Sequence, residues 1–176
     1  MSEAFRIPAA LDMRGRLVGP GEAGKGSVYR CPGCEERVDL HAGEKKARHF
    51  HHRVSSCTSE SVLHLCAKRF VAQVVEEWLA GGPSLVFVRR CGEPSCEAEC
   101  RQQLPAKVAG VALEHGLPSR RVVDVALLAR GARDAFLPLP VAVIEIVHTH
   151  AVDANKAFEI GVPWIEVEAA QVCASW

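Results

Sequence analysis

The spacing of cysteine and histidine residues between positions 31 and 57 constrains the fold of this chain more than any other feature. Cys31-Pro-Gly-Cys34 is a C-x2-C turn, in which proline and glycine let both thiolates face one ion. Fourteen residues separate this turn from His49-Phe-His-His52, which Cys57 follows. Two ligands from such a turn and two from a later segment make a tetrahedral zinc site. The sequence therefore predicts zinc, with the second pair of ligands drawn from four candidates: His49, His51, His52 and Cys57.

The residues around these ligands predict the short strands of a zinc ribbon, over 27–30, 37–41 and 45–51. In a regular strand His49 and His51 share one face, whereas His49 and His52 share a face only after a local twist or turn. The competing interpretation is a pair of reduced thiols beside a turn. The clustered histidines favour zinc.

Three further cysteines, Cys91, Cys96 and Cys100, lie in the polar, turn-rich stretch 89–105. They predict a candidate second zinc site, because thiols in a solvent loop would be exposed to oxidation. A solvent loop with free thiols is the alternative. The fourth ligand stays open among three residues: Cys57, Cys66 and Cys173.

Composition bounds the class of protein. The chain has 176 residues, of which 48% are apolar and 24% charged, enough for one domain with a sizeable core. No apolar run approaches the roughly 20 residues of a membrane span. Residues 1–16 contain no apolar leader, so we expect a cytoplasmic protein without a disulfide framework. Up to Arg90 the chain has 14 basic and 10 acidic residues, and after it 7 basic and 11 acidic residues. This distribution permits a basic face that binds nucleic acid.

One long helix and a later series of strands follow the ribbon. Apolar residues at helical spacing predict a helix over 58–80, which Gly81-Gly-Pro83 ends. Strands are predicted over 85–89, 107–114, 122–129 and 141–147, then a short helix capped by Asp153 and ended by Gly161, and a last strand over 164–168. The order is ribbon, helix, three-strand meander, helix, strand.

Two of these apolar strands each contain one carboxylate, Asp124 and Glu145. An ionised acid in an apolar strand is costly unless it is paired or binds a metal. Arg120 and Arg121 could neutralise Asp124, but they leave the second acid unexplained. Two carboxylates on adjacent strands make an oxygen site suited to Mg²⁺.

The arrangement resembles the P-D…(D/E)-x-K nuclease superfamily, and more closely the CoiA-like competence-protein nucleases. In chain order, the matching elements are Tyr29-Arg-Cys-Pro-Gly-Cys34, His49-Phe-His-His52, Glu60-x3-His64-x3-Lys68, Arg121-Val-Val-Asp124, Glu145-Ile-Val147, Lys156 and Trp164-Ile-Glu-Val. The resemblance implies an α/β (α+β) fold with a zinc-ribbon-like subdomain over 1–57. A restriction-endonuclease-like core over 58–176 would follow, a mixed sheet flanked by helices with a Cys-rich insertion at 90–105.

The resemblance also implies a role for each matching residue. Asp124 and Glu145 would bind catalytic Mg²⁺ or Mn²⁺, with Glu60 as the helix acid. His64 and Lys68 would form the ribbon-side face of the site. The H-F-x-H pattern favours His49 and His52 as the zinc ligands that accompany Cys31 and Cys34.

One position departs from the superfamily pattern. The catalytic lysine normally lies two residues after the acid, where this chain has Val147. Lys156 is a candidate for a migrated lysine, with a solvated helix charge as its alternative. His148 and His150 could polarise water or bind phosphate. Glu114 is either a further acid of the site or a surface charge at a strand end.

Three functions follow from these patterns. The first is a metal-dependent nuclease that hydrolyses phosphodiester bonds in DNA, and the second is a catalytically inactive nucleic-acid-binding protein of the same fold. The third is a zinc-stapled protein-interaction module with structural acids. We expect DNA as the partner, no membrane association, and a homodimer as a candidate assembly.

Overall fold

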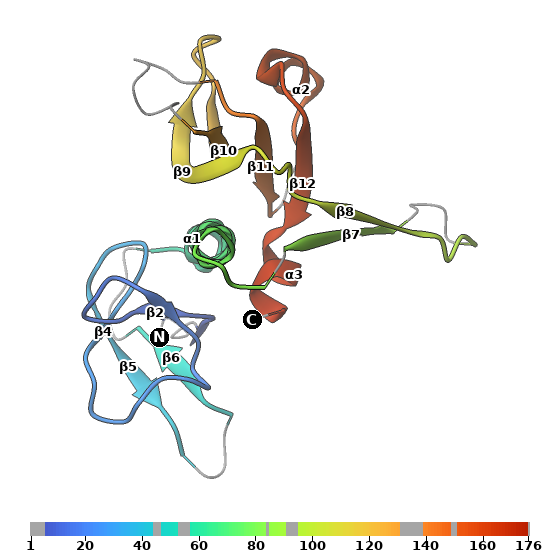
Figure 1. Cartoon of the computed structure of the whole chain (residues 1–176). Coiled ribbons are helices and arrows are strands. Elements are labelled where there is room, and N and C mark those ends of the chain that lie inside the picture. The colour runs from blue at the N-terminus through green and yellow to red at the C-terminus, as the bar shows by residue number, and fades with distance from the viewer. Residues whose placement is uncertain are drawn as a thin grey trace. The chain divides into compact units, whose positions relative to one another are not determined.

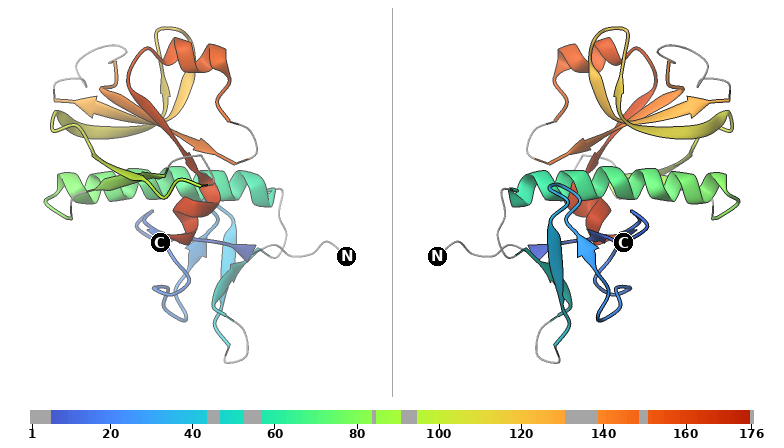
Figure 2. Two further views of the ribbon diagram at one scale, coloured as in Figure 1. Left: turned by 90° about the vertical axis from the view of Figure 1, so that its right-hand side faces the viewer. Right: turned by 90° about the vertical axis from the view of Figure 1, so that its left-hand side faces the viewer.

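The computed structural model is an α+β protein with several sheets and few helices (Figure 1 and Figure 2). It describes residues 6–43, 47–52, 57–83, 85–90, 95–130, 139–148 and 151–175. The chain divides into two compact units. Unit 1 comprises residues 1–71, 145–152 and 166–176, and unit 2 comprises residues 72–144 and 153–165. Within the described residues, no helix is both long and apolar enough to cross a membrane.

Unit 1 contains the ribbon, a six-stranded sheet of short strands in the order β1-β6-β5-β4-β2-β3. The strands are β1 (Arg6–Ile7), β2 (Ala10–Leu11), β3 (Leu17–Val18), β4 (Tyr29–Arg30), β5 (Arg37–His41) and β6 (His49–His51). The central hairpin pairs β5 with β6 antiparallel, with Leu40 opposite Phe50. The predicted ribbon strands are confirmed. The three strands before them were not predicted, because two residues are too few to show an alternating pattern.

A single hydrophobic core joins the ribbon to the first half of helix α1 (Ser59–Leu79). Phe50 is fully buried, and its ring centroid lies 5.1 Å from that of Tyr29. Val62 and Cys66 of α1 belong to the same core. Folding of the ribbon is therefore coupled to the part of α1 that lies in unit 1.

Helix α1 begins and ends where the sequence predicts. The hydroxyl of Thr58 accepts a hydrogen bond from the backbone N–H of Ser61 (3.1 Å), as an N-cap residue does. At the other end Gly81 adopts a left-handed φ of 96°. A Cβ at Gly82 would lie 2.7 Å from the carbonyl oxygen of Glu77, so the chain needs glycine to turn here.

The second sheet begins with a meander of three antiparallel strands, β9 (Val108–Gly116), β10 (Val122–Ala129) and β11 (Ala142–Val147), which belong to unit 2 up to Ile144. The strand β12 (Trp164–Glu168) completes a four-stranded sheet in the order β12-β11-β10-β9. Helix α2 (Ala154–Ile160) precedes β12; Asp153 caps it, and Gly161 ends it at a φ of 66°. These elements follow the order predicted from the sequence. Their own core includes Val123, Ala126, Val143 and Ile160.

Two further elements were not predicted. Strand β8 (Glu99–Gln103) pairs antiparallel with β7 (Val86–Arg90), and all five of its residues are exposed. A strand without a buried face has no apolar alternation to reveal it. Helix α3 (Ala169–Ala174) is only six residues long and directly follows β12.

Candidate metal centre

Four side chains of unit 1 converge on one point. The ligand atoms of Cys31, Cys34, His52 and Cys57 all lie within 4.8 Å of one another. Cys31 follows β4, Cys34 lies in the next turn, His52 follows β6, and Cys57 precedes α1. Three thiols and one imidazole are a ligand set of structural zinc sites. This group could therefore bind zinc structurally.

Backbone hydrogen bonds shape the C-x2-C turn. The N–H of Glu35 donates to the carbonyl of Cys31 (2.9 Å), and the N–H of Cys31 donates to the carbonyl of Glu36 (2.8 Å). The turn closes because Glu35 adopts a left-handed φ of 59°. The N–H of Gly33 points toward the Cys31 sulfur at 3.4 Å. Such N–H donors stabilise a thiolate and hold its sulfur toward the ion.

Gly33 leaves room for the cluster. A Cβ at this position would lie 3.2 Å from the Cys57 sulfur and 3.5 Å from side-chain atoms of Val62 and Leu65. A larger residue would therefore press on a ligand and on helix α1 together. The glycine of the C-x2-C turn serves close packing as well as turn formation.

The thiols are electrostatically unfavourable as thiolates unless a cation lies among them. Burial, together with the neighbouring Cys34 and Cys31, raises the pKa of Cys57 to about 12. Burial also raises the pKa of Cys31, opposed in part by backbone hydrogen bonds from Cys34 and Gly33. A divalent cation supplies the charge that removes this penalty, so the donor set fits zinc.

His52 places one ring nitrogen beside a thiol and the other near a carboxylate. It is 3% exposed, and its Nε2 lies 3.0 Å from the Cys34 sulfur. Its Nδ1 lies 4.0 Å from the carboxylate of Glu36. A carboxylate near the second ring nitrogen is the usual partner of a metal-binding histidine. Glu36 is a supporting residue that the sequence analysis did not identify.

The fourth member of the cluster is Cys57, where the H-F-x-H pattern favoured His49. Strand alternation explains the difference: Phe50 points into the core, so His49 and His51 face away from it. His52 lies beyond the end of β6 and turns toward the thiols. The ring of His49 instead lies 5.1 Å from that of His41.

The other cysteines form no comparable group within the described part of the chain. Cys96 is half-buried, Cys100 is exposed on β8, and Cys91 lies outside the described residues. Cys66 and Cys173 are hydrogen-bonded to backbone carbonyls in unit 1, at 3.7 Å from Ala9 and 3.8 Å from Leu63. A second zinc site stays a prediction.

Several of the residues expected at the nuclease site belong to unit 1. Glu145 of β11 is 2% exposed and Lys68 of α1 is 6% exposed, while His64 is half-buried. With His52, Glu145 and Lys68 make up the buried polar or charged side chains among the described residues. The side chain of Glu60 lies outside the described residues, as does His150.

The remaining candidates belong to unit 2. Asp124 is half-buried on β10. The flanking pairs Val123–His115 and Val125–Leu113 place Asp124 across from Glu114 of β9, whose φ is a left-handed 51°. Lys156 is half-buried in the first turn of α2, where its N–H donates to the Asp153 carboxylate at 2.9 Å.

The arginine beside Asp124 in sequence has another partner. The guanidinium of Arg121 forms an ion pair with Glu159 of α2, and this contact raises the pKa of Arg121. Glu159 therefore competes with Asp124 for the guanidinium of Arg121, which the sequence offered as a partner of Asp124.

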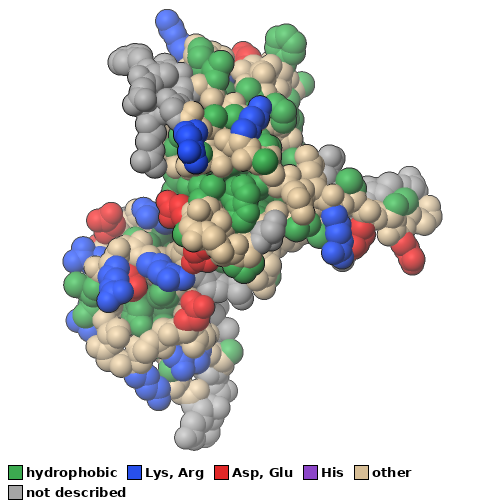
Figure 3. Space-filling view, in the orientation of Figure 1, with side chains coloured by type: hydrophobic (Ala, Val, Ile, Leu, Met, Phe, Trp, Pro, Cys, Tyr) green, Lys and Arg blue, Asp and Glu red, His purple; other side chains and the backbone are tan. Residues whose placement is uncertain are grey.

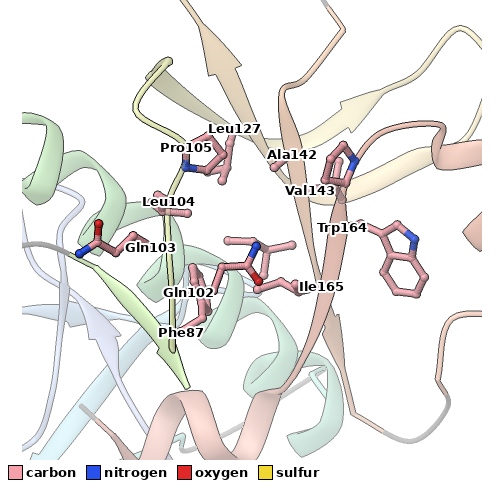
Figure 4. Close-up of a pocket in the computed structure, with 12 residues that line it drawn as sticks. Phe87, Gln102, Gln103, Leu104, Pro105, Leu127, Ala142, Val143, Trp164 and Ile165 are labelled. Atoms are coloured by element: carbon pink, nitrogen blue, oxygen red, sulfur yellow. The ribbon is translucent and has the colours of Figure 1, made fainter. Parts of the chain in front are cut away.

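A cavity of about 210 Å³ also lies in unit 2, between the β7–β8 hairpin and the four-stranded sheet (Figure 4). Its walls are mainly apolar, and the amide of Gln102 points toward Ile165. None of the residues that line it is charged, so this cavity is not the acidic site predicted from the sequence.

The metal centre lies in the part of the chain that is similar to a known family. Residues 22–60 match the family described as competence protein CoiA, N-terminal domain. The match spans β4 to β6 and all four members of the cluster. No curated protein and no solved structure matches the chain. The match supports a CoiA-like protein and leaves the activity open.

Proposed function

We propose that this chain is a metal-dependent nuclease acting on DNA, in which a zinc ribbon stabilises a restriction-endonuclease-like core. The observation that carries the proposal is the burial of Glu145. Its side chain is 2% exposed, and its neighbours along strand β11 are Ile144 and Ile146. An ionised acid in such a place needs a metal or a cation to offset its lost hydration. A second carboxylate on the neighbouring strand could bind the same metal as Glu145.

That partner is Asp124. Strands β10 and β11 pair antiparallel through Val125 and Ile144. Asp124 precedes Val125, and Glu145 follows Ile144. We infer that the two carboxylates bind one Mg²⁺ or Mn²⁺, which would activate water and neutralise charge on a phosphodiester.

The order of elements supports the proposed core. Helix α1, the meander β9–β10–β11, helix α2 and strand β12 follow one another, with the sheet strands adjacent in chain order. This is the order predicted from the sequence, in which the motifs that resemble the nuclease superfamily occur. The match of residues 22–60 to the N-terminal domain of CoiA supports the same family.

Exposed basic side chains support DNA as the partner. Figure 3 shows Lys and Arg side chains gathered over unit 1. Arg30 of β4 and Arg37 of β5 are both exposed and lie in directly paired positions. Neighbouring guanidinium groups on a ribbon suit contacts to successive phosphates. Zinc would hold this surface and the first half of α1 in place.

Cleavage by isosteric variants tests the proposal. Glu145→Gln and Asp124→Asn should each lower Mg²⁺- or Mn²⁺-dependent DNA cleavage at least about a hundredfold, because the metal loses a ligand while the side-chain shape is kept. The exposed Glu97→Gln serves as a matched control and should leave the rate unchanged. Circular dichroism checks folding. Full activity in either site variant would contradict the proposed metal site.

The second candidate is a DNA-binding protein of the same fold without catalysis. Val147 at the position of the usual lysine favours it. In that case the wild type binds DNA with an affinity that falls steeply with salt, yet cleaves no DNA form with Mg²⁺ or Mn²⁺. Cleavage that Lys156→Ala reduces would favour the nuclease instead.

A further inference from the structure

The β5–β6 hairpin has a second group of metal-binding side chains, on the face opposite its core. Strands β5 and β6 lie side by side (Figure 1), and their register pairs Asp39 with His51 and His41 with His49. Because side chains alternate along a strand, these four residues share one face of the hairpin. Phe50, between the two histidines of β6, is fully buried on the other. We call Asp39, His41, His49 and His51 the histidine face.

The imidazole rings have the spacing of rings that share an ion. The ring of His41 lies 5.1 Å from that of His49 and 4.9 Å from that of His51, centroid to centroid. Two imidazoles bound to one zinc at about 2.0–2.1 Å would have centroids about 4.5–5.2 Å apart, for angles between octahedral and tetrahedral. The rings are therefore close enough to share an ion, although those of His41 and His51 stack at an interplanar angle of 18° and must rotate before their nitrogens converge on it.

One ring also has its tautomer set for binding. The Nδ1 of His49 lies 2.9 Å from the carbonyl oxygen of Ala47, and because a carbonyl only accepts, Nδ1 carries the proton. In the neutral ring the lone pair is then on Nε2. A backbone carbonyl at Nδ1 is the arrangement that orients metal-binding histidines.

We propose that the histidine face binds one divalent transition-metal ion, separately from the Cys31–Cys34–His52–Cys57 cluster. Three imidazoles and a carboxylate suit Zn²⁺, Ni²⁺ and Cu²⁺ rather than Mg²⁺. The ring nitrogens reach a common ion after rotation of the side chains. His41 is exposed and the other three residues are half-buried, so the ion would exchange with solvent and bind more weakly than zinc among the thiols.

Calorimetric titration tests this site. The 176-residue protein that holds one zinc is titrated with ZnCl₂ in a buffer containing excess Mg²⁺, which competes for any carboxylate site. We expect one further Zn²⁺ per chain, bound more weakly than the first. His41→Ala and His49→Ala should each weaken this second event at least about tenfold while the first zinc is retained in elemental analysis, because each removes one ligand. His115→Ala, a histidine of β9 in unit 2, is the matched control and should bind as the wild type does.

Paramagnetic Ni²⁺ adds a second readout. At a low ratio of Ni²⁺ to protein, the imidazole resonances of His41, His49 and His51 should broaden before that of His115. Absence of a second Zn²⁺ event, or a second event that both alanine variants keep, would overturn the proposal. Loss of the first zinc in the folded His49→Ala variant would also overturn it, by assigning that residue to the thiol cluster.

Discussion

At the scale of single residues, the identity of the fourth zinc ligand depends on which way a short strand presents its side chains. The sequence offered four candidates, and the family pattern selected His49 and His52. The structure brings His52 and Cys57 to the C-x2-C turn. The missing information was the direction of Phe50, whose burial fixes the faces of β6 and turns His49 away. Periodicity alone shows that two residues share a face and leaves open which face is the core.

The ligand assignment predicts which substitutions release the zinc. Cys57→Ser should lose the tightly held zinc after gel filtration, because a hydroxyl replaces the thiolate, whereas His49→Ala should keep it. Elemental analysis of both variants measures this difference. Since burial raises the pKa of Cys57 to about 12, the metal-free thiol is protonated at neutral pH and zinc must displace its proton. Zinc affinity should therefore fall as pH is lowered, about tenfold per pH unit for each proton displaced.

Two outcomes would contradict this assignment. Zinc that stays with Cys57→Ser and leaves with His49→Ala would restore the ligand pair favoured by the H-F-x-H pattern. Zinc affinity independent of pH between about 6 and 8 would mean that the thiols are already ionised in the metal-free protein.

At the scale of elements, predictability followed the length of the apolar pattern. Helix α1 and strands β9 to β11 have long runs with buried residues, and the sequence locates them to within a few residues. Strand β8 is exposed at every position, and it pairs with β7 through its backbone. The side chains of β8 therefore show no apolar alternation from which the pairing could be predicted. The same limit applies to the candidate site, because the sequence can name acids in apolar strands but cannot fix their surroundings.

The N-cap of α1 gives a prediction at this scale. Thr58, which directly follows Cys57 of the candidate metal cluster, accepts a hydrogen bond from the N–H of Ser61. Thr58→Ala should lower the free energy of unfolding by about 1 kcal/mol, the usual effect of removing a cap. Thr58→Ser, which keeps the hydroxyl, should lose less than half of that. Urea unfolding of the zinc-loaded proteins measures both, and equal losses would show that the cap hydrogen bond does not contribute.

At the scale of the whole molecule, each of the two units has a core of its own. The core of unit 1 includes Cys31 of the metal cluster with Val62 and Cys66 of α1, and Cys34 and Cys57 pack against it. The core of unit 2 is built from its sheet strands and α2. The sequence predicted a ribbon that ends at residue 57. The shared core instead couples the metal cluster to the first half of α1, which the sequence could not reveal because helical periodicity does not name the partner of an apolar face.

Zinc removal should therefore act on unit 1 before unit 2. Chelation leaves buried thiols without a cation and a ribbon whose strands are mostly two or three residues long, so β5, β6 and the first half of α1 should lose amide-exchange protection. Strands β9 and β10 pair over at least seven residues and should stay protected. Hydrogen exchange with mass spectrometry, before and after chelation and again after zinc is restored, separates the two units.

Simultaneous loss of protection in β9 and β10 would mean that the chain unfolds as one cooperative body, with zinc stabilising all of it. Unchanged protection in β5 and β6 after complete zinc loss would mean that the hydrophobic core, rather than the metal, holds the ribbon.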